Sequence, residues 1–153
     1  MLLQISTTLC CSLETAIAQV KKPRLLFYVA KPIVRFRPID PPTLPENWTE
    51  GTYWVALKVL GIIPFGRQAI RISFPSVKTG FAIRDNGYSA VIRMWDHTIT
   101  IVEAQEGCRY EDRIEVAAGL LTPFVWLFAR MFYTHRQRRW RRLVRRSFNY
   151  SDA

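Results

Sequence analysis

The chain has 153 residues, enough for one domain with its own hydrophobic core. Apolar residues make up 49% and charged residues 22%, a balance that excludes disordered, collagen-like and low-complexity chains. The three cysteines are too few and too oddly placed for a disulfide framework, and without C-x-x-C spacing they do not form a metal site, so a reducing cytoplasm is the simplest setting. The net charge is +10, and residues 120–153 hold eight arginines against one acidic residue, so the excess belongs to the C-terminal end.

The first part of the chain predicts a strand, a helix and a rigid connection. Residues 2–11 are rich in β-branched and small apolar types, which is typical of a short strand. Ser12 then opens a helical pattern that ends before Pro23. Residues 38–45 hold four of the nine prolines, so we expect an extended crossing there rather than a helix.

From Gly51 onward the sequence predicts antiparallel strands. We expect these strands at residues 52–60, 67–74, 80–84, 88–105 and 108–117. The glycine-bounded residues 61–66 predict the first turn. Asn86-Gly87 predicts a hairpin, because both residues tolerate positive φ.

The last hairpin has one apolar and one polar face. A turn at Glu106-Gly107 would place His97 opposite Val116 on the apolar face, which we expect to be buried or to line a cavity. Three polar side chains share this face with His97: Glu103, Tyr110 and Asp112. The opposite face is polar and is expected to contact water.

A helical period runs from Gly119 to Arg146, which corresponds to a helix about 40 Å long. Its first half, residues 120–133, is apolar nearly all round, so we expect it to be covered on most sides. This apolar stretch is shorter than the roughly 20 residues that span a bilayer. We therefore interpret it as a core helix.

The order of these elements predicts an α+β fold in which a curved antiparallel sheet wraps around a long C-terminal helix. This arrangement buries both apolar surfaces at once. We expect one domain over residues 1–146, with a short helical and proline-rich region at 12–50, the sheet at 51–118, the helix at 119–146 and a tail at 147–153.

Residues 95–119 (WDHTITIVEAQEGCRYEDRIEVAAG) and the following helix resemble the START-like superfamily, also called SRPBCC, which has the helix-grip fold. The residues that carry the resemblance are Trp95, His97, Gly107 and Asp112. The resemblance covers most of residues 50–146. It implies an internal cavity that takes hydrophobic or amphipathic molecules such as lipids, polyketides or aromatic compounds, and it implies no cofactor.

The resemblance and the aromatic content together indicate non-covalent binding of a hydrophobic small molecule between the sheet and the helix. The candidate ligand-binding residues are Trp54, Arg71, Arg93, Trp95, His97, Tyr110, Asp112, Phe124, Phe128 and Arg130. Arg130 stands alone in an apolar helix stretch, so it must reach water, a carboxylate or an anionic ligand group. The inner-face carboxylates could anchor a ligand or pair with the arginines.

Catalysis is the alternative. Asp96-His97 is the one pairing that indicates acid–base chemistry, but neighbouring strand residues point to opposite faces. We therefore interpret His97 as a hydrogen-bonded wall residue and assign no catalytic residue. A cyclase- or dehydratase-like enzyme that uses His97 or Asp112 as its base stays open, and no metal site is expected.

Residues 136–146 contain seven arginines. A solvated helix end is the first interpretation, an anionic membrane surface the second, and nucleic acid the third. The residues that would face an anionic surface are Arg136, Arg138, Arg139, Trp140, Arg141, Arg142, Arg145 and Arg146. The prediction is thus a cytoplasmic protein, peripheral to the membrane in the second interpretation, with no prediction of its oligomeric state.

Overall fold

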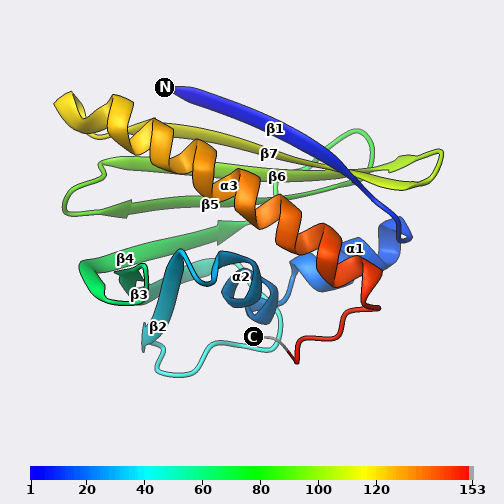
Figure 1. Cartoon of the computed structure of the whole chain (residues 1–153), viewed down its shortest axis with the longest axis horizontal. Coiled ribbons are helices and arrows are strands. Elements are labelled where there is room, and N and C mark those ends of the chain that lie inside the picture. The colour runs from blue at the N-terminus through cyan, green and yellow to red at the C-terminus, as the bar shows by residue number, and fades with distance from the viewer. Residues whose placement is uncertain (152–153) are drawn as a thin grey trace.

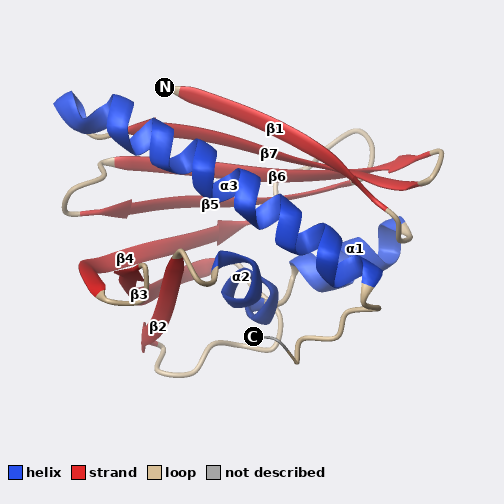
Figure 2. Ribbon diagram, viewed as in Figure 1, coloured by secondary structure: helices blue, strands red, loops and turns tan. Residues whose placement is uncertain are grey.

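A computed structural model describes residues 1–151. A seven-stranded antiparallel sheet, in the order β1-β7-β6-β5-β4-β3-β2, curves around a long C-terminal helix (Figure 1, Figure 2). The elements are β1 (Leu2–Leu9), α1 (Leu13–Val20), α2 (Pro23–Ala30), β2 (Val34–Asp40), β3 (Gly51–Val59), β4 (Ile63–Ser73), β5 (Phe81–Ser89), β6 (Met94–Ala104), β7 (Gly107–Ala117), the 3-10 turn η1 (Gly119–Leu121) and α3 (Thr122–Arg145). The predicted α+β helix-grip fold is confirmed.

Local sequence signals explain where the helices begin. Ser12 caps α1, because its Oγ accepts a hydrogen bond of 3.1 Å from the Thr15 amide. Proline occupies the first turn of α2 and of α3. Its missing backbone N–H costs nothing there, because the first N–H groups of a helix have no acceptor within the helix. Within residues 1–151, no helix has both the length and the hydrophobicity needed to cross a membrane.

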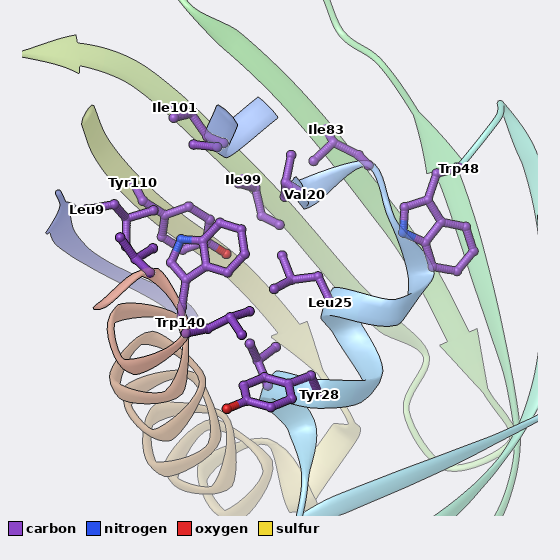
Figure 3. Close-up of a cluster of buried hydrophobic side chains, with 14 of the residues drawn as sticks. Leu9, Val20, Leu25, Tyr28, Trp48, Ile83, Ile99, Ile101, Tyr110 and Trp140 are labelled. Carbon is purple, nitrogen blue, oxygen red and sulfur yellow. The ribbon is translucent and has the colours of Figure 1, made fainter. Parts of the chain in front are cut away.

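The larger part of the core lies where the second half of α3 meets the sheet and the two short helices (Figure 3). Trp140 of α3 packs against Tyr110 of β7, with ring centroids 5.8 Å apart. Leu9 at the end of β1 and Leu25 of α2 belong to the same cluster. This end of the sheet is therefore closed by tightly packed side chains.

The prediction of a turn at Asn86-Gly87 is wrong. Both residues lie within β5, where Gly87 pairs with Trp95. A Cβ atom on Gly87 would lie 2.5 Å from the Ala69 carbonyl oxygen, so the glycine permits the close approach of β4. The expected long strand 88–105 is accordingly split, because the chain reverses between Ser89 and Met94.

The β6–β7 hairpin turns one residue earlier than predicted. Ala104 pairs with Gly107, so His97 lies opposite Ile114 rather than Val116. Every predicted partner is shifted by two residues, and a shift of two leaves each side chain on its predicted face. Glu103 nonetheless lies exposed beyond the covered part of the sheet.

The first half of α3 is not covered as expected. One face of it is open to solvent, and Leu120 is 96% exposed. The exposed apolar residues of η1 and α3 are Leu120, Leu121, Phe124, Leu127 and Met131. The sheet covers the opposite face, which carries Ala129, Phe132 and Tyr133.

The sheet also reaches further toward the N-terminus than the expected range of 51–118. Strand β1 pairs with β7, and β2 pairs with β3 as an edge strand. Pro38 lies within β2, which an edge strand tolerates because one side of its backbone needs no partner.

Candidate functional site

A cavity of about 480 Å³ lies between the concave face of the sheet and α3. Aliphatic and aromatic side chains of β2 to β6, α1, α2 and α3 form most of its wall. Five wall residues are also exposed at the surface and mark the mouth: Ile63, Phe65, Val91, Leu121 and Phe124. The mouth therefore lies between the β3–β4 hairpin, the β5–β6 loop and the first turns of α3.

The volume is in the range of about 300–1,000 Å³ that is typical of small-molecule sites. The few hydrogen-bonding side chains on the apolar wall include Gln68, Asp85, His97, Tyr133 and Arg136. An apolar wall with a few converging polar groups is the usual composition of a binding site for a hydrophobic or amphipathic molecule.

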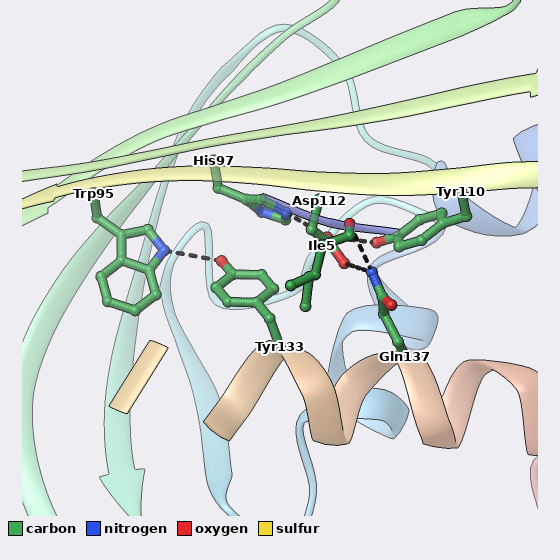
Figure 4. Close-up of polar contacts among 7 residues, drawn as sticks. All are labelled: Ile5, Trp95, His97, Tyr110, Asp112, Tyr133 and Gln137. Carbon is green, nitrogen blue, oxygen red and sulfur yellow. Dashed lines mark hydrogen bonds and ion pairs between the residues drawn. The ribbon is translucent and has the colours of Figure 1, made fainter. Parts of the chain in front are cut away.

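Asp112 of β7 organises a buried polar network next to the cavity (Figure 4). Its Oδ1 contacts His97 Nε2 at 2.7 Å and accepts a hydrogen bond of 2.8 Å from the Tyr110 hydroxyl. Its Oδ2 accepts a hydrogen bond of 2.9 Å from Gln137 Nε2, which also donates to the Ile5 carbonyl at 3.1 Å. The carboxylate is fully buried and fully hydrogen-bonded, which fixes α3 relative to the sheet.

The network sets the charges of its members. Burial alone would raise the pKa of Asp112, but hydrogen bonds from His97 and Gln137 and the positive charge of Arg136 hold the pKa below its ordinary range. Burial is the largest influence on His97 and, with the positive charge of Arg136, lowers its pKa despite the opposing effect of Asp112. We therefore describe an anionic Asp112 that accepts the Nε2–H of a neutral His97.

His97 and its neighbours form one wall of the cavity. The His97 ring lies against Tyr133 with centroids 4.6 Å apart, and the Trp95 Nε1 donates a hydrogen bond of 3.1 Å to the Tyr133 hydroxyl. Burial raises the pKa of Tyr133 well above its ordinary value, so its hydroxyl stays neutral. These contacts hold the rings in fixed positions on the wall.

Arg136 of α3 also lines the cavity, although it is only 7% exposed. Its guanidinium lies over the Tyr133 ring at 4.8 Å and near the Phe132 ring at 5.7 Å. Within residues 1–151 it makes no hydrogen bond or ion pair, and its Nε is buried without a partner. Burial opposes its charge, but Tyr110, Tyr133 and the nearby carboxylates outweigh burial and raise its pKa.

Asp85 of β5 is the second carboxylate of the cavity region. Its Oδ1 accepts a hydrogen bond of 2.9 Å from the Arg71 backbone amide. Burial raises the pKa of Asp85 to about 7, against the lowering effects of that hydrogen bond and of Arg136. Asp85 therefore changes its charge near neutral pH.

The cavity brings together four of the ten predicted ligand-binding residues, namely Trp95, His97, Phe124 and Phe128. Tyr110 and Asp112 are buried behind its wall, where they hold His97 in place.

The other four predicted residues, Trp54, Arg71, Arg93 and Arg130, are not among the residues that line the cavity. Arg71 alternates with the inward-facing Ile70 and Ile72, which places it on the outer face. Trp54 contacts Tyr88 and Arg67 outside the cavity wall. Arg93 is exposed, and Arg130 is exposed beside Trp126.

The C-terminal arginines also differ from the prediction. Arg136 and Trp140 are buried and cannot face a membrane surface. Arg139 donates a hydrogen bond of 3.0 Å to the Tyr28 carbonyl, and Arg141 donates one of 2.8 Å to Thr7 Oγ1, so both hold α3 to neighbouring elements. Four arginines of the predicted set are exposed: Arg138, Arg142, Arg145 and Arg146.

Sequence reasoning missed Arg136 and Asp85 as cavity residues. Helical spacing could have found Arg136, since it continues the stripe formed by Ala129, Phe132 and Tyr133. Asp85 carries no comparable signal. The described residues contain no group of three or more His, Cys, Asp or Glu placed to hold a metal ion.

Three solved structures, one of them of a START superfamily protein, have a fold similar to that of this chain. The protein TTHA0849 from Thermus thermophilus matches with a TM-score of 0.68 at 10% identity, covering 97% of this chain and 100% of that one. The AHSA1 protein SPO3351 from Silicibacter pomeroyi matches with a TM-score of 0.61 at 14% identity, covering 96% and 99%. A START superfamily protein from Mycobacterium smegmatis matches with a TM-score of 0.58 at 13% identity, covering 95% and 97%.

The resemblance to the START-like superfamily is thus confirmed at the level of the fold. The chain belongs to the family of the domain of unknown function DUF8410, whose sequence model matches residues 37–145. None of the curated proteins matches the chain in sequence.

Proposed function

We propose that this protein binds a hydrophobic or amphipathic small molecule non-covalently in the cavity between the sheet and α3. The observation that carries the proposal is the cavity of about 480 Å³ with its mostly apolar wall. Water gains little in such a space because it finds few hydrogen-bond partners there, whereas an apolar guest regains dispersion contacts with the wall.

The driving force is the burial of apolar surface. A guest that removes about 300 Å² of apolar area from water gains about 7 kcal/mol before the costs of ordering are subtracted. His97 and Gln68 offer hydrogen bonds at the wall, and they would select among apolar guests rather than provide the affinity.

Native mass spectrometry of gently purified protein, together with lipid extraction, tests whether a molecule co-purifies. Titration with dodecanol then tests binding directly, using a Leu57→Trp variant that fills the cavity from β3. Lys58→Trp is the matched control, because the adjacent side chain is exposed. We expect Leu57→Trp to weaken binding at least tenfold and Lys58→Trp to leave it unchanged, and equal effects would contradict the proposal.

The exposed apolar rim favours a second role, which is docking of the cavity mouth on an anionic membrane. The rim consists of the exposed apolar residues of η1 and α3 together with Leu60, Ile62, Ile63, Phe65 and Val91. The charged residues in segments 56–70, 88–95 and 116–135, which form the rim, are all basic: Lys58, Arg67, Arg93 and Arg130. Basic side chains near an anionic surface contribute about 1 kcal/mol each, and the apolar rim would enter the interface.

Co-sedimentation with vesicles of phosphatidylglycerol and phosphatidylcholine tests this role. A Phe124→Ser, Leu127→Ser variant removes two exposed rim side chains, and we expect it to lose most of its vesicle binding. The matched control is Arg142→Gln, Arg145→Gln, which lowers the positive charge at the far end of α3 (Figure 1). If only the control loses binding, the arginine-rich end is the membrane contact and the rim is not.

A further inference from the structure

The buried guanidinium of Arg136 is the one cationic side chain on the described wall of the cavity. It is carried by α3, on the face that packs toward the sheet. Phe132 and Tyr133 cover one side of it. The side chain also lines the cavity, and only 7% of the residue is exposed to solvent.

The neighbouring carboxylates do not satisfy this guanidinium. Asp112 already accepts hydrogen bonds through both oxygens, and its donors are His97, Tyr110 and Gln137. Asp85 accepts from a backbone amide, and no ion pair joins either carboxylate to Arg136. A guanidinium has five N–H donors, and leaving them unpaired inside a protein is unfavourable.

We propose that Arg136 is the anchor for the carboxylate of an amphipathic ligand, with the alkyl or ring portion of that ligand extending through the apolar cavity toward the mouth. This inference rests on the proposed function. Arginine suits the role because its planar fork binds two carboxylate oxygens in parallel. The Tyr133 ring, whose centroid lies 4.8 Å from the guanidinium carbon, stabilises the charge by a cation–π contact.

The local charge favours a monoanion over a dianion. Asp112 is anionic behind the wall, and Asp85 lines the cavity with a pKa of about 7. A dianionic phosphate would therefore meet repulsion from both carboxylates, whereas one carboxylate balances the single charge of Arg136. A cationic amphiphile would be repelled by Arg136 itself.

Isothermal titration with four amphiphiles of equal chain length tests the inference: dodecanoate, dodecanol, dodecyl phosphate and dodecyltrimethylammonium. Wild-type protein is expected to bind dodecanoate about tenfold to a hundredfold more tightly than dodecanol, as a charge-assisted bidentate contact predicts. Arg136→Met removes the charge and keeps the bulk, so this variant should bind dodecanol normally and lose its preference for dodecanoate. Arg138→Met, at an exposed position of the same helix, should behave as wild type.

The outcomes separate the two proposals. If wild-type protein binds none of the four amphiphiles, the proposed function fails and this inference fails with it. If dodecanol and dodecanoate bind equally, or if Arg136→Met keeps the preference, the cavity binds apolar molecules but Arg136 does not anchor them. Tighter binding of dodecyl phosphate would replace the carboxylate by a phosphate. If Arg136→Met does not fold, the wild-type series still tests the preference for a carboxylate, for which Arg136 is the one cationic side chain on the described wall.

Discussion

Asp85 makes the stability of the folded protein depend on pH. In the unfolded chain its pKa has the ordinary value of 3.8, and in the folded protein burial raises the pKa to about 7. The folded state therefore binds more protons than the unfolded state between these values, and stability falls as the pH rises through this window. Asp85→Asn keeps an oxygen for the Arg71 amide and removes the titration.

The two pKa values set the size of the effect. The pKa of Asp85 is 3.8 in the unfolded chain and about 7 in the folded protein. With these values the free energy of unfolding falls by about 2 kcal/mol between about pH 5 and about pH 7. Asp85 keeps some contact with solvent, so we take about 1 kcal/mol as the smallest change consistent with this reasoning.

Urea unfolding of wild type and Asp85→Asn across this pH range measures the difference. The wild type should lose stability relative to the variant as the pH rises. Asp96→Asn is the control: the hydrogen bond from Arg84 lowers the pKa of Asp96, so its contribution is lost only at lower pH. Parallel pH profiles for wild type and Asp85→Asn would refute the reasoning.

Further predictions concern the second half of α3 and its contribution to stability. Trp140→Ala should lower the free energy of unfolding by about 3–5 kcal/mol, measured with urea, because the indole is buried. A change within about 0.5 kcal/mol is typical of a surface position and would contradict this burial. Gln137→Leu removes the donor to Asp112 and to the Ile5 carbonyl, and it should cost about 1–3 kcal/mol. A neutral effect in thermal and urea unfolding would show that the Asp112 network does not hold α3 to the sheet.

Patterns with a single local cause were predictable from the sequence. The long C-terminal helix follows from its period, and the buried face of β6 and β7 follows from alternation. The prediction of which side chains share the buried face is correct although each predicted partner is off by two residues, because side chains alternate between faces with a period of two. Alternation around Ile70 and Ile72 could equally have excluded Arg71 from the cavity.

Features that depend on distant parts of the chain were not predictable. Gly87 has the sequence signature of a turn, but its reason for being glycine is the backbone of β4. The hydrogen bond from the Arg71 amide to Asp85 joins two strands and has no local signal. Arg136 is one of seven arginines in residues 136–146. Its charge predicts an exposed position, whereas its helical spacing predicts the buried position that the structure shows.

The alternative in which Asp112 serves as a catalytic base does not fit its position, because the carboxylate is fully buried and outside the cavity wall. His97 faces the cavity with Asp112 behind it, so it is the residue through which any acid–base chemistry would act. In the binding account its role is to offer a hydrogen bond at the wall.

A crystal structure of the protein grown with dodecanol tests the central claim most directly. The account predicts continuous density for the alkyl chain between Leu57, Phe128 and Phe132, in the space that these side chains now line. A structure in which side chains close that space, with dodecanol found only on the outer surface, would contradict it.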